Sequence, residues 1–253
     1  MKHLIPDGFT FTILRDPVET FESFFSYMNI DQKVGVDINK FAWEYATQDG
    51  NMALDVTRGR NRQLFDLGLD VNKMEKEDEV KAKIEDLDKE FDQVLILEHL
   101  EESLVIMADR LCWPLEQVCN VRLNSRTKEF VSKISMESRD ILTDWLWAEY
   151  FLYNHFLQKH KLSVSKFGAQ KTIQEVGRLR SINLDLTEQC AEKAADGIEN
   201  AEKVFKPLNK KIKPVVPQGS KKWCRPFFKT EISYTKVLRK LNRALVSSRV
   251  ESS

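Results

Sequence analysis

The segment around Arg15 has the residue types and spacing of an oxyanion site. Arg15 follows the apolar stretch Phe9–Leu14, and Asp16 and Pro17 are residues that commonly begin a helix. An arginine at a helix N-terminus combines the guanidinium with the free N–H groups of the first turn and the helix dipole. Ser23, eight residues after Arg15, lies within two turns, where its hydroxyl can donate to the same anion. The pattern leaves two interpretations open, a phosphate site and an ordinary ion pair of Arg15 with a nearby acid.

A strand followed by a helix has to position these groups. The β-branched and aromatic residues of Phe9–Leu14 predict a strand buried largely on both faces. Asp16 is expected to cap the helix, with Pro17 at its first position and Glu19 at its third. Large apolar residues then recur at helical spacing and predict an apolar inner face, made of Phe21, Phe24, Phe25 and Met28.

A second unit of the same kind follows, with a strand over Phe91–Glu98 and a helix from about Leu100 to Cys112. Two such units predict a parallel α/β sheet. Glu98 ends the second strand, at the edge where α/β sheets present functional side chains. An acceptor-site role and capping of the following helix both account for a glutamate there. Cys112 itself is expected to be a small buried hydrophobe.

The remaining sequence is mainly of helical character, and we expect one domain over residues 1–253. Its α/β part covers 1–113 and its mainly helical part covers 114–253. The strongly charged stretch 73–90 is predicted to be a solvated helix. Other helices are predicted over 37–45, 141–158, 172–186 and 231–246, and an irregular Lys- and Pro-rich connection over 206–222.

Composition excludes several classes of function. Lys plus Arg equals Asp plus Glu at 39 each, so no global charge attracts nucleic acid. No apolar run reaches the roughly 18 residues of a membrane span, and the first residues lack the apolar core of an export signal. The four cysteines have no CxxC pair, and we expect no metal. Cysteines this sparse favour, on their own, a reducing compartment.

Several segments resemble one enzyme family. Thr12–Tyr27 resembles the segment of sulfotransferases in which an arginine and a serine eight positions later hold the 3′-phosphate of 3′-phosphoadenosine 5′-phosphosulfate (PAPS). More narrowly, it is similar to the galactose-3-O-sulfotransferase family. Further segments resemble this family in the same order, namely Asn61–Gly68, Leu95–Val105, Leu111–Trp113, Arg122–Asn124 and Tyr153–Phe156.

The resemblance implies a P-loop-like α/β fold and transfer of a sulfuryl group from PAPS to the 3-hydroxyl of galactose. The acceptor would be a glycolipid such as galactosylceramide, or a glycan. Arg15 and Ser23 would hold the donor's 3′-phosphate. The polar loop Arg60, Asn61 and Arg62, followed by Gln63, resembles a segment that contacts nucleotide or acceptor. His155 matches the family but stands among aromatic residues on a helix, which is more typical of a packed core than of a substrate contact.

Family members carry a membrane anchor, a 5′-phosphosulfate loop and their catalytic base upstream of the arginine motif. No such loop precedes Arg15 in this sequence, so we expect an N-terminally truncated form without an assigned base. His155 and Glu98 are the candidates within the chain. The implied location is the lumenal side of the Golgi, with membrane attachment only through the anchor that this sequence does not contain.

The resemblance also extends to a C-terminal cysteine pair. Cys190 and Cys224 are the expected disulfide, which would place the protein in an oxidising lumen rather than a reducing compartment. Two other functions stay open. One is a catalytically inactive protein of the same fold that binds a glycan or a partner chain. The other is a nucleotide-dependent phosphotransferase, which the absence of a GxxxxGK[ST] motif disfavours.

Overall fold

A computed structural model describes residues 7–47, 59–121, 126, 130–193, 215–217, 222–228 and 231–250. It is mostly helical with a small parallel sheet, which fits the predicted α/β class. The chain divides into two compact units, one of residues 1–118 and 128–180 and one of residues 119–127 and 181–253. Within the described ranges, no helix combines the length and apolar character needed to cross a bilayer.

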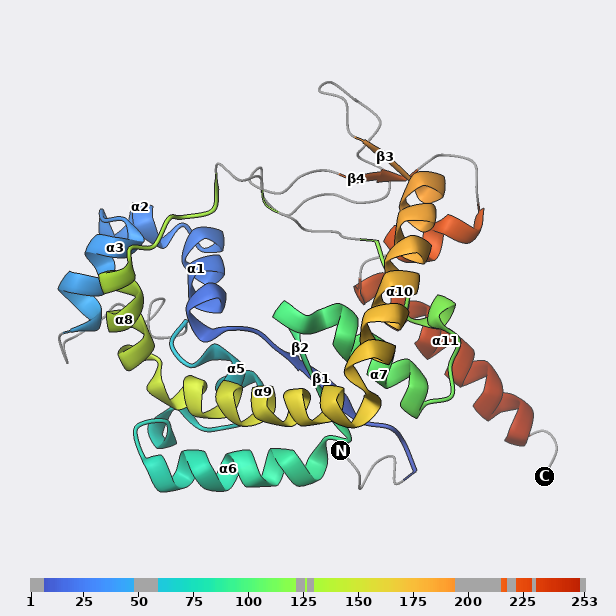
Figure 1. Cartoon of the computed structure of the whole chain (residues 1–253), viewed down its shortest axis with the longest axis horizontal. Coiled ribbons are helices and arrows are strands. Elements are labelled where there is room, and N and C mark those ends of the chain that lie inside the picture. Colours follow the sequence, from blue (N-terminus) through green and yellow to red (C-terminus); the bar gives the residue numbers. More distant parts are fainter. Residues whose placement is uncertain are drawn as a thin grey trace. The chain divides into compact units, whose positions relative to one another are not determined.

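The parallel sheet consists of β1 (Phe11–Leu14) and β2 (Gln93–Ile96), as the two strand–helix units predict. The register pairs Phe11 with Gln93 and Leu14 with Ile96. Because the strands are parallel and in step, both end at the same edge. Figure 1 shows β1 and β2 side by side. The residues that follow them, Arg15 and Glu98 among them, are therefore brought to one side of the sheet.

The predicted burial of the first strand on both faces is wrong. Leu14 is 1 % exposed, whereas Phe11 and Ile13 are 53 % and 46 % exposed. Successive strand residues point to opposite faces, so one face of β1 meets the core and the other is open in the described structure. Phenylalanine and threonine alternate over residues 9–12, but the face that carries Thr10 and Leu14 is the buried one, so this alternation indicates the wrong face.

Helix α1 (Pro17–Tyr27) begins as predicted, with the side chain of Asp16 accepting a hydrogen bond from the amide of Glu19 at 2.9 Å. Its buried aromatic side chains meet those of α3 and α8, with ring centroids of Phe21 and Trp145 5.0 Å apart. This first core cluster contains Val18, Phe21, Phe25, Ile30, Ile38, Phe41, Ala42, Leu142, Trp145 and Leu146.

The helix predicted over 141–158 is two helices, α8 (Met136–Trp145) and α9 (Trp147–Phe167). They break at the buried Leu146, whose φ of −96° and ψ of 22° depart from helical values. The break separates two cores. Helix α8 belongs to the first cluster, whereas α9 packs into a second one with Leu14 and Ile96 of the sheet and Ile84 of α6.

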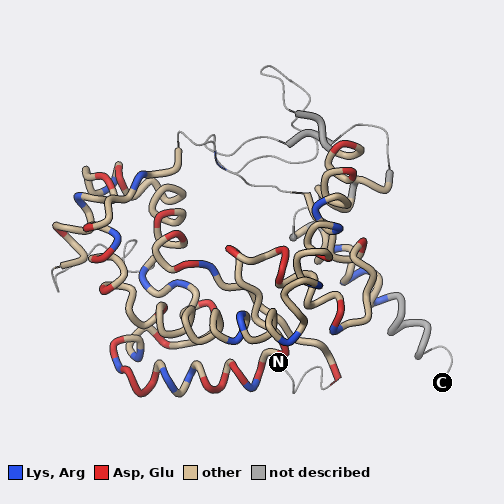
Figure 2. The backbone as a smooth tube through the Cα atoms, in the orientation of Figure 1, with Lys and Arg blue, Asp and Glu red and all other residues tan. Residues whose placement is uncertain are grey.

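Helix α6 (Glu77–Glu90) is the predicted solvated helix. Acidic and basic residues alternate along it (Figure 2), and its buried side chains are Val80, Ile84 and Leu87. Helix α7 (Leu100–Arg110) follows β2 through the short turn η3 (Leu97–His99). The remaining elements of this unit are α2 (Ile30–Val34), α3 (Ile38–Phe41), η1 (Ala42–Ala46), α5 (Arg62–Asp66), η2 (Val71–Lys73) and η4 (Leu115–Gln117).

Cys112 is not the buried hydrophobe expected from the sequence. Helix α7 ends at Arg110, and Cys112 is exposed with a φ of 52°. The chain turns away after the helix in the left-handed region, so the thiol points out of the core.

The predicted C-terminal helices are present with longer bounds, α10 (Ala169–Cys190) and α11 (Glu231–Val250). A disulfide joins Cys190 and Cys224, the pair that the family resemblance implies. Leu186 and Phe228 are buried beside it. The other elements are the antiparallel strands β3 (Ala191–Lys193) and β4 (Val215–Pro217) and the 3₁₀ segment η7 (Lys222–Phe228). Most of the connection predicted over 206–222 lies outside the described residues.

Candidate functional site

Arg15 leaves β1 with its backbone held by a side chain from another element. The amide of Arg15 donates to Oε1 of Gln63 at 2.8 Å, and Nε2 of Gln63 donates to the carbonyl of Arg15 at 2.9 Å. The side chain of Gln63 thus pairs with the end of β1 as a neighbouring strand would. This double bond fixes the peptide from which the Arg15 guanidinium projects.

Gln63 reaches Arg15 because its loop runs close to α1. A Cβ atom added to Gly59 would lie 2.5 Å from Cδ1 of Phe24, so only glycine permits this approach. Asn61 has a φ of 51° and is 1 % exposed, and its Oδ1 has no hydrogen-bond partner among the described residues. Tolerance of this left-handed conformation is a property of asparagine. The course of this loop therefore depends on a glycine at position 59 and an asparagine at position 61.

A buried carboxylate holds the first turn of α5 behind Gln63. Glu149 of α9 is 1 % exposed and accepts a short hydrogen bond from the amide of Gln63. Burial raises the pKa of Glu149 to about 7, because desolvation outweighs the hydrogen bonds from the backbone of Gln63 and Leu64. Glu149 thus changes its charge near neutral pH. It is hydrogen-bonded to the backbone of Gln63, the residue whose side chain holds Arg15.

Glu98 lies at the same edge of the sheet and holds the turn that follows Arg15. Its Oε1 accepts from the amide of Asp16 at 3.0 Å, and its Oε2 accepts from the Tyr153 hydroxyl at 3.1 Å. Burial and the neighbouring carboxylate raise the pKa of Tyr153, so the phenol stays protonated as a donor. Glu98 therefore tethers the start of α1 rather than capping the helix that follows β2.

The Arg15 side chain faces an acidic partner. Its Nη2 lies 3.8 Å from Oε2 of Glu19, and Arg139 of α8 binds the other oxygen of the same carboxylate. Arg139 also lies 3.7 Å from Oδ1 of Asp16. Two guanidiniums and two carboxylates thus balance around the first turn of α1. Arg139 gave no sequence signal, because it lies 120 residues from Glu19.

Ser23 lies on the same face of α1 as Glu19, one turn further along, because residues four apart share a helix face. An anion that extends from Arg15 toward Ser23 therefore passes Glu19. Glu19 thus lies between Arg15 and Ser23, although the sequence pattern assigned it only to the start of the helix. Whether Arg15 and Ser23 bind a phosphate together stays a prediction.

Arg60 and Arg62 flank this site but hold other partners. Nε of Arg60 donates to the carbonyl of Trp145 at 3.1 Å, and its guanidinium pairs with Glu75 at 2.7 Å. Arg62 pairs with Asp66 at 3.0 Å on its own short helix. Of the polar loop, Gln63 is thus the residue whose side chain contacts Arg15.

His155 lies elsewhere on α9. Its Nε2 is 3.6 Å from Oδ2 of Asp88 on α6, and its ring meets Phe156 edge to face. The structure therefore pairs His155 with the charged helix and not with the groups around Arg15. The motif Arg122–Asn124 lies outside the described residues.

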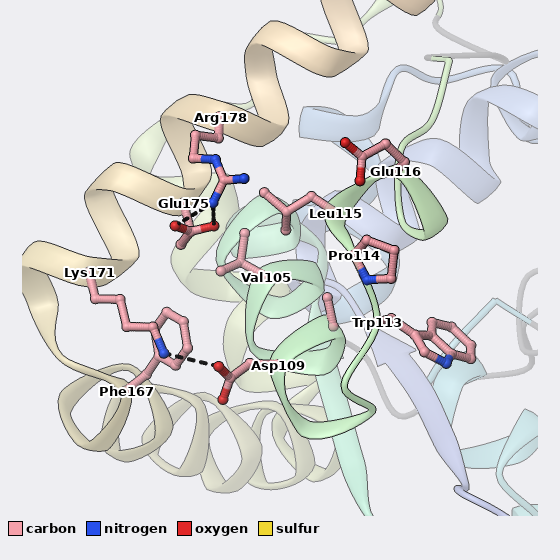
Figure 3. A pocket seen from close by; sticks show the side chains of 11 residues that line it. Val105, Asp109, Trp113, Pro114, Leu115, Glu116, Phe167, Lys171, Glu175 and Arg178 are labelled. Atoms are coloured by element: carbon pink, nitrogen blue, oxygen red, sulfur yellow. Dashed lines mark hydrogen bonds and ion pairs between the residues drawn. The ribbon is translucent and has the colours of Figure 1, made fainter.

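A separate cavity of about 300 Å³ lies between the C-terminal part of α7 and the start of α10 (Figure 3). Its charged side chains pair with one another, Asp109 with Lys171 at 2.9 Å and Glu175 with Arg178 at 2.8 Å. None of the site residues predicted from the sequence lines it.

Comparison with known proteins defines the class. The family model for galactose-3-O-sulfotransferase matches residues 1–239, so the chain belongs to the galactose-3-O-sulfotransferase family. It is 30 % identical to galactosylceramide sulfotransferase from Bos taurus over 260 residues, covering 92 % of this chain and 60 % of the relative. It is 33 % identical to galactose-3-O-sulfotransferase 2 from Homo sapiens, covering 73 % of this chain and 48 % of the relative.

The chain thus spans about half to three fifths of the length of these relatives. No solved structure matches it. The family name gives galactose-3-O-sulfotransferase as the class of enzyme with which this site is compared.

Proposed function

We propose that the protein transfers a sulfuryl group from PAPS to the 3-hydroxyl of galactose. The observation that carries this proposal is the position of Arg15. It stands at the end of a parallel strand and before a helix N-terminus, with its backbone held on both sides by Gln63. A guanidinium and the positive end of the helix dipole converge there, which favours binding of a phosphate.

In this mechanism, Arg15 and Ser23 bind the 3′-phosphate of the donor and so orient the nucleotide. Transfer of the sulfuryl group resembles phosphoryl transfer, in which positioning and stabilisation of negative charge dominate. Glu19 has to release Arg15 as the phosphate arrives, and Arg139 is placed to keep the Glu19 carboxylate after that exchange. The base that takes the galactose proton is not assigned, because Glu98 is held by Asp16 and Tyr153.

The proposed acceptor is a galactose-terminated glycolipid such as galactosylceramide, or a glycan. The proposed location is the lumen of the Golgi, with which the disulfide between Cys190 and Cys224 agrees, because disulfides persist in oxidising compartments. A P-loop-like arrangement of the complete sheet is part of the proposal. A non-catalytic protein that binds a glycan or partner chain is the second candidate, favoured by the charge balance around Arg15.

Calorimetric titration of this chain separates the two candidates without requiring turnover. We expect 3′-phosphoadenosine 5′-phosphate to bind and adenosine 5′-phosphate to bind at least about tenfold more weakly, since only the former engages Arg15 with a 3′-phosphate. Arg15→Ala should lower the affinity by about 2 to 3 kcal/mol. Arg178→Ala, which removes an exposed guanidinium paired within α10, is the matched control. Equal affinities of the wild type and Arg15→Ala would refute the site.

A further inference from the structure

Three side chains that the proposed reaction does not use converge between the start of α7 and the middle of α9. Nδ1 of His99 lies 3.3 Å from Oε2 of Glu102, and Nε2 of His160 lies 3.1 Å from the same oxygen. The ligand atoms of all three residues lie within 4.8 Å of one another. Two imidazoles and one carboxylate that meet in this way form a donor set that Zn²⁺ accepts in proteins.

Two of the three distances between the ligand atoms fit a tetrahedral zinc site closely; each such distance is one edge of the tetrahedron. Bonds of about 2.0 to 2.2 Å to zinc place neighbouring ligand atoms about 3.3 to 3.5 Å apart. The two separations to Glu102, at 3.3 and 3.1 Å, are close to this edge length. The third edge joins the two rings, whose centroids are 5.2 Å apart. The His99 side chain is 42 % exposed, so it is able to turn toward the ion.

His160 is held in the orientation that a metal ligand needs. Its side chain is 3 % exposed, and its Nδ1 lies 3.4 Å from Oγ of Ser103, a fully buried residue. The amide of Ile96, at the end of β2, donates to the same Oγ at 3.2 Å. Metal-bound histidines commonly place their second nitrogen against such a partner, which fixes the ring and the tautomer. Nε2 is thereby directed at Glu102.

We propose that His99, Glu102 and His160 bind one Zn²⁺ ion, with a water molecule as the fourth ligand. Imidazole nitrogens distinguish this set from the all-oxygen sites that Mg²⁺ and Ca²⁺ prefer. The ion fastens the first turn of α7 to α9 and fixes the turn η3 (Leu97–His99), which carries Glu98. The absence of CxxC pairs, on which the sequence-based expectation of no metal rested, does not bear on a histidine and carboxylate site.

The full chain, stripped with a chelator under non-reducing conditions, tests this site by calorimetric titration with ZnCl₂ and by thermal melting. We expect one ion per chain and a higher melting temperature with the ion bound, because a ligand that binds only the folded state stabilises it. His99→Ala and Glu102→Gln alter residues at least one third exposed and should weaken binding about 100-fold, whereas His160→Ala removes a buried side chain.

His155→Ala is the matched control, since it removes another α9 histidine that faces a carboxylate, Asp88. It should bind zinc as the wild type does. Co²⁺ in place of Zn²⁺ should give the strong visible absorption of a tetrahedral site, and this absorption should disappear in His99→Ala. Unchanged stoichiometry and affinity in the folded His99→Ala and Glu102→Gln variants would overturn the proposal, as would failure of the wild type to bind. None of these readouts depends on PAPS or on sulfate transfer, so they stand apart from the proposed function.

Discussion

The side chain of Gln63 brackets the peptide unit of Arg15, accepting from its amide at 2.8 Å and donating to its carbonyl at 2.9 Å. The glutamine side chain makes the pair of hydrogen bonds that a neighbouring strand would make at the end of β1. The consequence is that the Arg15 backbone is fixed by a residue that does not itself supply charge. Affinity for an anion at Arg15 should therefore depend on Gln63 as well as on the guanidinium.

Replacing Gln63 with alanine should weaken binding of 3′-phosphoadenosine 5′-phosphate while leaving Arg15 in place. Two backbone groups lose their partners, which costs about 1 to 3 kcal/mol of stability, and the arginine loses its fixed starting point. Calorimetry and denaturant unfolding measure the two effects. Gln174→Ala, on the exposed face of α10, should change neither. Normal affinity in a destabilised Gln63→Ala variant would show that Arg15 needs no such support.

Glu19→Gln should tighten binding of the same nucleotide about 3- to 10-fold, because the carboxylate that shares Arg15 and Arg139 competes with an incoming phosphate. The neutral amide keeps the size of the side chain and its place on α1. Glu175→Gln, which breaks a comparable pair with Arg178 on α10, should leave the affinity unchanged. Weaker binding in Glu19→Gln would instead mean that Glu19 positions the arginines.

The local parts of this site could be predicted from the sequence, because neighbouring residues determine them. Asp16, Pro17 and Glu19 specify the start of α1 by capping chemistry, and two strand–helix units specify parallel pairing. The open face of β1 could not be predicted, since Phe11 and Ile13 are as apolar as a buried strand requires.

Long-range partners left no comparable signal. Arg139 meets Glu19 across 120 residues, and Glu149 meets Gln63 across 86. Each looks in the sequence like an ordinary charged residue of a helix. The break at Leu146 was missed for a related reason, because neither proline nor glycine marks it and only the division between two cores requires it.

The disulfide gives a prediction for the second unit. Cys224→Ser should lower its stability by roughly 3 to 4 kcal/mol, because the bridge closes a loop with a sequence separation of 34 residues. Thiol titration of the unfolded, non-reduced chain should find two of the four cysteines, Cys112 and Cys119. Cys112→Ser, at an exposed position, serves as the control for melting experiments. Four titratable thiols would contradict the bridge in solution.

Glu149 gives a pH dependence whose sign follows from its burial. Its pKa rises from the ordinary 4.5 to about 7 on folding. Between pH 4.5 and about pH 7, the folded state therefore keeps a proton that the unfolded state has released. The contribution of Glu149 to stability is therefore fully present below pH 4.5 and is lost as the pH rises through about 7. The shift corresponds to a loss on the order of 3 kcal/mol.

Glu149→Gln should remove this loss, because the amide carries no charge at any pH in the range. The free energy of unfolding of both proteins, measured from pH 4.5 to pH 8, should show a steeper decline in the wild type. Glu75→Gln, at an exposed carboxylate, controls for the general effect of removing a charge. Parallel curves for the wild type and Glu149→Gln would mean that Glu149 is ionised throughout and that the amides of α5 hold it as a carboxylate.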